Sequence, residues 1–205
     1  MKKYLIIALL MILGTAYPSY ARWAVGAAGG GVAAAAASCT INNTFSNVGA
    51  VSNYHNIGYD ASFGYLGTTF NPDANISVCR VIANLDYTSG TAANNTYYAQ
   101  IYSGTYEDAL GVALGTSSGV TGSNAWDDSE VTFNFSPAVA LTSGGNYRIV
   151  ISIGGDGTVN DTDIVKVRYV GSNSWSYGLE VNCNTSKATC DASSSEDMYI
   201  KIYGE

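Results

Sequence analysis

Residues 130–135 read Glu-Val-Thr-Phe-Asn-Phe, and this short run decides the fold class. Apolar and polar side chains alternate at every position, so all three apolar side chains fall on one face of an extended chain. An α-helix would scatter the same residues around its axis. The run therefore predicts a β-strand with one buried and one solvated face.

The same period-two pattern returns along the chain on both sides of this run. Its clearest instances are Cys79–Tyr87, Tyr147–Ile153, Val165–Tyr169 and Met198–Tyr203. Weaker candidates, which bring the total to about nine strands, lie at residues 63–70, 97–103, 112–116 and 174–181. Two antiparallel sheets packed face to face bury all these apolar faces at once. We therefore predict an all-β fold, a jelly-roll-like antiparallel β-sandwich of two sheets.

The N-terminal residues are typical of a secretory signal. Lys2 and Lys3 precede an apolar run from Tyr4 to Ala16, which is shorter than the roughly 20 residues of a membrane span. Small residues at positions 19 and 21 favour cleavage after Ala21. We expect the protein to be secreted or held at a cell surface, without a stable membrane span.

Three segments follow from this interpretation. Residues 1–21 form the signal peptide, residues 22–38 form a linker composed almost entirely of Ala and Gly, and residues 39–205 form one β-sandwich domain. The linker is also apolar enough to dock on a neighbouring subunit, so self-association is an alternative role for it.

Charge excludes several classes of partner. The chain has 9 Lys+Arg and 16 Asp+Glu and a net charge of −7, which becomes −9 when Lys2 and Lys3 leave with the signal peptide. Nucleic acid and anionic membranes would be repelled by this field. We predict instead an extracellular polysaccharide or a cell-surface component as the partner.

Four cysteines in an exported chain predict two disulfides, for which sequence alone allows three pairings. We expect Cys183 to pair with Cys190 across a short polar loop, and Cys39 to pair with Cys79, which would tie the start of the domain to a core strand. A zinc site is disfavoured because the chain has no Cys-x-x-Cys spacing and one histidine, His55.

Several strand motifs occur in an order that resembles a known family. They are Leu66–Pro72, Ile76–Val81, Ala99–Ser103, Ala113–Ser117, Val131–Phe135 and Leu141–Tyr147. Together they resemble the secreted bacterial sandwich domains called choice-of-anchor R, over about two thirds of the chain. The resemblance implies a β-sandwich and export, and it implies no assigned reaction.

Aromatic residues supply the candidate binding site. The 16 Tyr and 3 Trp exceed what a core requires, and rings of both types can lie at a surface. Trp126 stands beside Asp127 and Asp128 in a polar loop, where an indole can stack on a sugar ring while carboxylates accept hydroxyl hydrogen bonds. Trp175 and Tyr177 share one face of a predicted strand.

The loop at residues 154–163 is the candidate metal site. It contains Asp156, Asn160, Asp161 and Asp163, and hard cations such as Ca²⁺ prefer clusters of oxygen ligands. The spacing does not follow the EF-hand pattern. We expect no cofactor, with a structural calcium ion in this loop as the alternative.

Catalytic patterns are weak. Residues 115–119 match the Gly-x-Ser-x-Gly string of hydrolases, but the strand-turn-helix context of a nucleophile elbow is missing. Asp127 with Glu130, or Asp156 with Asp163, could supply the two carboxylates of a glycoside hydrolase. Acids in turns more often stay solvated, so we do not expect an enzyme.

Three functions therefore follow from the sequence. The first is an exported, non-catalytic β-sandwich that binds an extracellular glycan or surface. The second is a structural subunit of an extracellular layer or filament. The third is a glycoside hydrolase.

Overall fold

The computed structural model describes residues 39, 43–49, 51–57, 64–90, 95–106, 108–154, 164–171, 179–184, 186–188, 190–193 and 196–205. All of them belong to one compact unit, residues 34–205. The predicted signal peptide and linker lie outside the described residues. So do Trp175, Tyr177 and the predicted calcium ligands Asp156, Asn160, Asp161 and Asp163.

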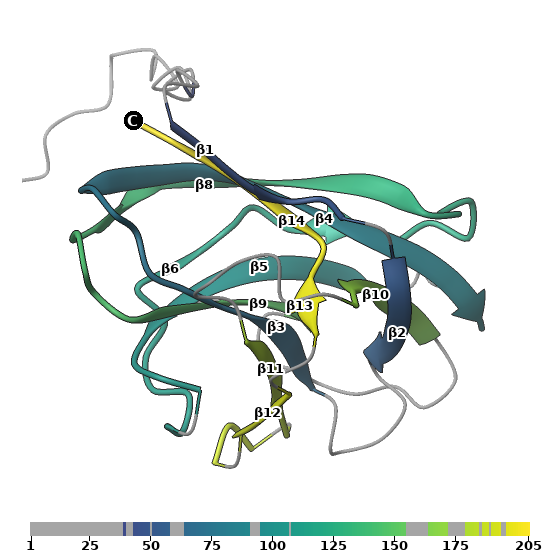
Figure 1. The fold of residues 1–205 in the computed structure, drawn as a ribbon. Helices are drawn as coiled ribbons and strands as arrows, with labels where there is room; N and C mark the ends of the chain where they lie inside the picture. The colour runs from purple at the N-terminus through teal and green to yellow at the C-terminus, as the bar shows by residue number, and fades with distance from the viewer. Residues whose placement is uncertain are drawn as a thin grey trace, which may run out of the picture. The chain divides into compact units, whose positions relative to one another are not determined.

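Seven strands form the first sheet, which we call sheet A: β1 (Asn43–Asn47), β2 (Val51–Ile57), β4 (Ile76–Ser89), β8 (Ser129–Leu141), β10 (Ile164–Val170), β13 (Asp197–Met198) and β14 (Ile200–Gly204). The long strand β4 pairs with β8 along one side, while β14 and β10 share its other side. Beyond them, β1 pairs with β14, and both β2 and β13 pair with β10. Figure 1 shows β1, β4, β8 and β14 of this sheet above the second sheet, with β2, β10 and β13 lower down.

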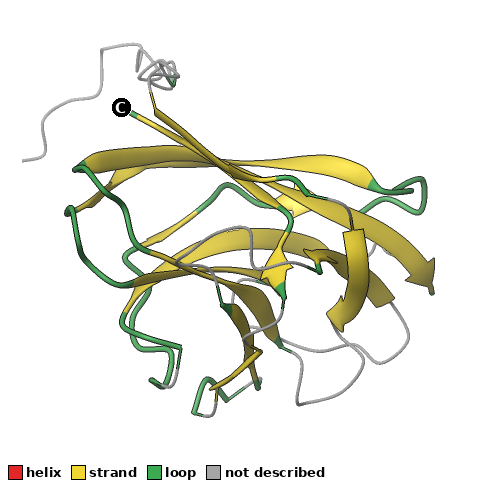
Figure 2. Ribbon diagram, viewed as in Figure 1, coloured by secondary structure: helices red, strands yellow, loops and turns green. Residues whose placement is uncertain are grey.

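The second sheet, sheet B, also has seven strands: β3 (Tyr65–Phe70), β5 (Thr96–Ser103), β6 (Gly115–Thr116), β7 (Val120–Thr121), β9 (Tyr147–Ile153), β11 (Glu180–Cys183) and β12 (Cys190–Ser193). Their order is β12-β11-β3-β9-β5-β6, and β7 also pairs with β5. No helix occurs among the described residues (Figure 2), and none of their segments is a long apolar helix of the kind that crosses a membrane.

The chain alternates between the two layers along most of its length. In sequence order β3, β5, β9 and β11 enter sheet B, and β4, β8, β10 and β14 enter sheet A between and after them. Every strand pairing in both sheets is antiparallel. The predicted antiparallel sandwich is therefore confirmed, and the alternation between layers accords with its jelly-roll-like arrangement.

The core lies between the sheets and is built by the alternating residues. Val131, Phe133 and Phe135 of β8 are buried in it, as are Ile149 and Ile151 of β9. Fully burying a side chain of this kind contributes roughly 1.5–3 kcal/mol. The inward faces predicted for 165–169 and 198–202 are buried in the same cluster.

Strand β4 departs from the predicted alternation at Cys79, the first residue of the predicted run Cys79–Tyr87. In β4 the register shifts between Val78 and Arg80, so Val78 fills the core position that the sequence assigned to Cys79. Val81, Ala83 and Leu85 point inward as predicted. The shift frees Cys79 from the alternation and leaves it available for a disulfide.

Other predicted strands differ more from the strands of the structure. The predicted strand at 112–116 is reduced to β6, because Val112 is 91 % exposed and lies in a loop. The predicted strand at 174–181 is described only as β11, which begins at Glu180. Strands β1 and β2 were not predicted, because their sequences, NTFSN and VSNYHNI, are mostly polar and lack a strict alternation.

Both predicted disulfides are present. Cys39 is bonded to Cys79, with Cα atoms 5.7 Å apart, and Cys183 is bonded to Cys190, with Cα atoms 4.1 Å apart. The first joins the start of the domain to the central strand of sheet A. The second joins directly paired residues of β11 and β12. Two disulfides are typical of proteins from oxidising compartments.

Gly67 offers a test of the packing of sheet B. A Cβ at this position would overlap the Ile149 carbonyl oxygen and come within 2.6 Å of Val150 Cα. Both are backbone atoms of the paired strand β9, so they cannot move aside. We expect Gly67→Ala to lower the free energy of unfolding by about 3 kcal/mol, measured by urea denaturation. Gly111→Ala is the control, because nothing lies within 4 Å of its Cβ; equal losses in the two variants would contradict this account.

Candidate functional site

The outer face of sheet B is covered rather than solvated. Alternation predicts that Val150 and Ser152 of β9 face solvent, yet both are buried. A second apolar cluster lies on this face, made of Tyr65, Tyr102, Leu110, Val150, Val181, Cys183 and Cys190. We call residues 104–106 and 108–114 the cover segment, since Leu110 packs in this cluster. The Leu110 N–H donates to the Lys187 carbonyl (2.9 Å), which ties the cover segment to the β11–β12 hairpin.

Arg148 holds the cover segment on the sheet. Its side chain is completely buried, and its guanidinium donates to the carbonyl oxygens of Ser103 (3.0 Å), Ala109 (3.2 Å) and Asp108. Burial lowers the pKa of Arg148, while the nearby Asp108 and Tyr102 oppose that shift. Burial also raises the pKa of Tyr102 to about 12, against the effect of Arg148. A fork of donors that satisfies three carbonyls is an arrangement that arginine provides and lysine does not.

Asp108 shapes the turn at the start of the cover segment. Its Oδ2 accepts hydrogen bonds from the Thr105 N–H (2.8 Å) and from the Thr105 hydroxyl (3.0 Å). These two bonds, the backbone one first, lower the pKa of Asp108 from its ordinary value of 3.8, with a smaller contribution from Arg148. The turn thereby fixes Thr105 and its neighbours above the ends of β3 and β9.

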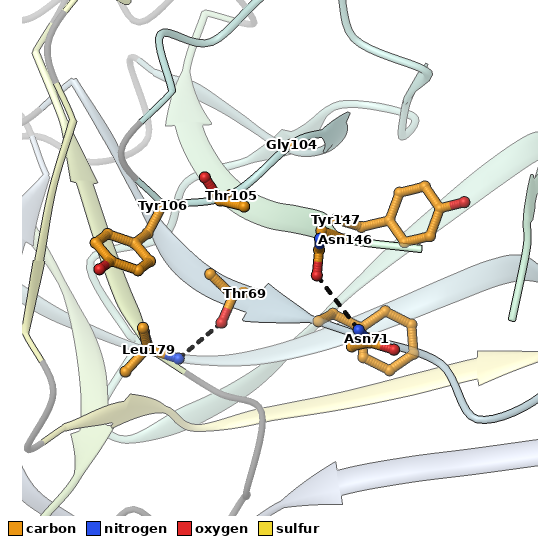
Figure 3. Close-up of a pocket in the computed structure, with 9 residues that line it drawn as sticks. Thr69, Asn71, Gly104, Thr105, Tyr106, Asn146, Tyr147 and Leu179 are labelled. Carbon is orange, nitrogen blue, oxygen red and sulfur yellow. Dashed lines mark hydrogen bonds between the residues drawn. The ribbon is translucent and has the colours of Figure 1, made fainter. Parts of the chain in front are cut away.

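A cleft of about 200 Å³ opens between this turn and the strand ends (Figure 3). Its walls come from the end of β3, the turn after β5, the start of β9 and the residue before β11. The lining residues are Thr69, Phe70, Asn71, Gly104, Thr105, Tyr106, Asn146, Tyr147 and Leu179. None of these nine carries a charged side chain at neutral pH. The volume is below the roughly 300–1,000 Å³ of sites for drug-sized ligands, so the cleft suits one ring or one chain end.

Polar groups in the cleft are held by hydrogen bonds. Thr69 Oγ1 accepts from the Leu179 N–H (2.8 Å), and Asn71 Nδ2 donates to Asn146 Oδ1 (3.3 Å), as Figure 3 shows. The second bond leaves Asn71 Oδ1 as an acceptor and Asn146 Nδ2 as a donor. Neither of these two atoms has another partner among the described residues. The cleft therefore presents one acceptor and one donor whose orientations are already fixed.

Two half-buried tyrosines complete the cleft. Figure 3 shows the Tyr106 ring beside Thr69 at one end of the cleft and the Tyr147 ring beyond Asn146 at the other end. The Tyr147 hydroxyl accepts a hydrogen bond from the Thr142 N–H (2.9 Å), which fixes that ring. Aromatic faces beside a fixed donor and acceptor, without net charge, provide the contacts that a neutral polyhydroxylated ring requires.

The structure places the predicted residue Trp126 against the core. Its half-buried indole packs on the main cluster and meets the Tyr97 ring edge to face, with centroids 5.3 Å apart. Its carbonyl oxygen accepts from the Tyr87 N–H (2.8 Å). The ring is thus packed against the protein and only partly exposed.

Asp127 and Asp128 lie next to Asp86, which the sequence did not indicate. One carboxylate oxygen from each of the three lies within 4.8 Å of the others. Asp128 also forms an ion pair with Arg168, and its carbonyl oxygen accepts from Asn84 Nδ2 (3.1 Å). Asp127 and Asp128 are exposed, so this group is a solvated acidic cluster with one cation already beside it.

The described catalytic candidates are engaged in structural contacts. Ser117 is buried; its hydroxyl accepts from the Ala99 N–H (3.0 Å) and donates to the Ser118 carbonyl (2.9 Å). Glu130 accepts hydrogen bonds from Lys201 Nζ (2.5 Å) and the Tyr199 hydroxyl (2.7 Å). The Lys201 bond contributes most to the lowered pKa of Glu130. These contacts explain both residues without catalysis.

The sequence did not predict the cleft. Asn71 directly follows β3 and Asn146 directly precedes β9, and such asparagines are ordinary turn residues in a sequence rich in Asn and Gly. The only signal in the sequence was one asparagine directly after the predicted strand 63–70 and another directly before the predicted strand 147–153. Nothing in the sequence showed that those two strands pair.

Replacement of Arg148 tests how the cover segment is held. Arg148→Lys keeps a positive charge but cannot reach all three carbonyls, so buried acceptors lose their donors. We expect the free energy of unfolding to fall by about 3 kcal/mol in urea denaturation. Arg80→Lys is the matched control: Arg80 is only partly buried, and its Nε donates to Asn134 Oδ1 (3.1 Å). We expect a loss below about 1 kcal/mol for it, and similar losses in both variants would contradict the anchoring role of Arg148.

The Asp108 turn gives a pH dependence with a defined sign. A carboxyl whose pKa is lowered in the folded protein adds stability above its ordinary pKa, and this stability is lost as the pH falls through the lower value. Asp108→Ala should therefore lower the thermal midpoint at pH 7, and the difference from the original protein should shrink below about pH 4. Thermal denaturation followed at several pH values measures it. A difference that is constant with pH would contradict the ionised Asp108 turn.

Comparisons with known proteins give no relative from which a function could be transferred. No protein-family model matches the chain, and no curated protein sequence matches it significantly.

Proposed function

We propose that the protein is an exported, non-catalytic β-sandwich that binds a neutral extracellular glycan in the cleft beside the cover segment. The observation that carries the proposal is the pairing of Tyr106 and Tyr147 with the fixed amides of Asn71 and Asn146. Sugar rings present C–H faces that pack on aromatic rings and hydroxyl groups that both donate and accept hydrogen bonds. The cleft contains a partner for each of these groups.

Charge supports a neutral ligand. The chain has a net charge of −7, so an acidic polysaccharide would be repelled over most of the surface. The cleft itself has no charged lining residue that could offset this repulsion. A neutral hexose or the end of a neutral chain meets no such penalty.

Two other findings support the extracellular location and the non-catalytic role in this proposal. The disulfides Cys39–Cys79 and Cys183–Cys190 suit an extracellular location. The buried Ser117 and the hydrogen-bonded Glu130 have structural roles that leave them poorly placed for a nucleophile or a general acid. The sequence resemblance to choice-of-anchor R domains implies export and agrees with the proposed compartment.

Removal of one ring tests the proposal. We expect Tyr106→Ala to weaken retention on the bound neutral polysaccharide by about tenfold or more, which corresponds to ~1.4 kcal/mol of binding free energy. The measurement is affinity electrophoresis followed by isothermal titration with the glycan that retains the original protein. Thermal denaturation checks that the variant is folded.

Two controls locate the site. Tyr203→Ala removes a half-buried tyrosine from sheet A and should leave affinity unchanged. Asp127→Asn alters the patch around Trp126 that the sequence indicated, and it should also leave affinity unchanged. Loss of binding in Asp127→Asn alone would move the site to the Trp126 patch. Failure of the original protein to bind any member of a broad neutral-glycan panel would overturn the proposal.

A further inference from the structure

A cluster of ionisable side chains lies where the two sheets meet, apart from the cleft. His55 belongs to β2 of sheet A, where it is opposite the buried Val167. Glu180 begins β11 of sheet B, opposite the buried Thr68. Glu196 precedes β13, and its carbonyl oxygen accepts from the Glu180 N–H (3.0 Å). Three segments that are distant in sequence thus bring an imidazole and two carboxylates together.

The spacing of these groups is that of metal ligands. His55 Nε2 lies 3.1 Å from Glu196 Oε2 and 3.5 Å from Glu180 Oε1. One ligand atom from each of the three residues lies within 4.8 Å of the others. Two ligand atoms bound to one tetrahedral Zn²⁺ at about 2.0–2.1 Å are roughly 3.3 Å apart. Small side-chain adjustments would therefore bring all three atoms to bonding distance of one ion.

Glu180 is an independent reason to expect a ligand. Its side chain is 5 % exposed, yet within the described part of the chain its carboxylate accepts no hydrogen bond. Its nearest polar contact is His55 Nε2, and Glu196 adds a second negative charge. A buried carboxylate without hydrogen bonds is costly unless a cation accompanies it. Burial raises the pKa of Glu180, and Glu196 raises it further while His55 lowers it.

Neighbouring residues hold the other two groups in position. Asn53 Nδ2 donates to Glu196 Oε1 (2.8 Å), which turns Oε2 toward His55. The His55 ring packs edge to face on the buried Tyr169, with centroids 4.8 Å apart. Fixed ligands of this kind reduce the entropy lost when an ion binds.

We propose that His55, Glu180 and Glu196 bind one divalent transition-metal ion, Zn²⁺ being the representative, and that the ion fastens sheet A to sheet B at this edge. The imidazole nitrogen favours a transition metal over Ca²⁺ or Mg²⁺, which prefer oxygen ligands. Two carboxylates and a neutral imidazole together carry the charge that a divalent ion neutralises. Three protein ligands leave a fourth position for water. The proposal is independent of glycan binding in the cleft.

The single histidine makes a direct test available. Because His55 is the only histidine, the tag-free protein shows one set of imidazole resonances in proton NMR. After removal of metals with EDTA and then of the EDTA, titration with Zn²⁺ at pH 7 should shift these resonances until one equivalent is bound. At zinc concentrations about 100 times Kd the thermal midpoint should rise by roughly 5–10 °C. Ca²⁺ should shift neither.

Variants assign the ligands. Glu180→Gln keeps the shape of the side chain but removes its charge, and it should weaken Zn²⁺ binding by about 100-fold or more, since loss of a mere supporting contact costs about 10–100-fold. Glu196→Gln, at a more exposed position, should do the same and serves if Glu180→Gln does not fold. Asp127→Asn, in the exposed acidic cluster, is the matched control and should bind Zn²⁺ like the original protein.

Two results would overturn the proposal. The first is that Zn²⁺ leaves the His55 resonances unmoved, in which case the three side chains form an ion pair network within the protein alone. The second is that folded Glu180→Gln and Glu196→Gln both bind Zn²⁺ as tightly as the original protein. Weak binding that is lost in Asp127→Asn instead would place the ion at the exposed acidic cluster and would also overturn it.

Discussion

The buried guanidinium of Arg148 is the interaction on which the outer half of the molecule depends. A β-sandwich needs only one buried face on each sheet, and the second face of sheet B could have remained solvated. Here Tyr65, Tyr102 and Val150 make that face apolar, so it requires a cover. Arg148 lies near the start of β9 on this face and donates to the Asp108 and Ala109 carbonyls of the cover segment, which gives the loop one position instead of many. Burial of the Arg148 charge costs free energy. This cost is offset because the guanidinium donates to backbone carbonyl oxygens that would otherwise be buried without a hydrogen bond.

The cleft is a consequence of that cover. Gly104, Thr105 and Tyr106 reach their place because the next residues of the segment are fastened to Arg148 and to the β11–β12 hairpin. The opposite wall of the cleft comes from β3 and β9, which pair with each other, so that wall is rigid. A binding site between a rigid sheet edge and a fastened loop loses little entropy on binding, which suits a weak and polar ligand such as a sugar.

Sequence patterns predicted what depends on near neighbours. Alternation in 130–135 and 147–153 identified β8 and β9 and their inward faces, because a period of two follows from strand geometry itself. The pairing of Cys183 with Cys190 followed from a short polar loop between them. Alternation failed for Arg148 and Val150, which it placed in solvent, because the cover segment packs on this face of sheet B. It failed for β1 and β2 because edge strands rich in Asn and Ser gain their place from pairing with β14 and β10 rather than from their own apolar residues.

Both candidate sites were beyond sequence reasoning for the same physical reason. The cleft draws on four separate segments and the His55 cluster on three, so neither set of residues forms a motif in the sequence. A count of histidines argued against zinc, yet one imidazole suffices when the fold supplies two carboxylates from other strands. The two sites also differ in charge in the way the two proposed ligands require. The cleft excludes charged side chains and suits a neutral sugar, whereas the edge between the sheets concentrates negative charge beside a nitrogen ligand and suits a cation. Negative charge of this chain thus lies at the edge between the sheets, where a cation would offset it, and is absent from the lining of the cleft.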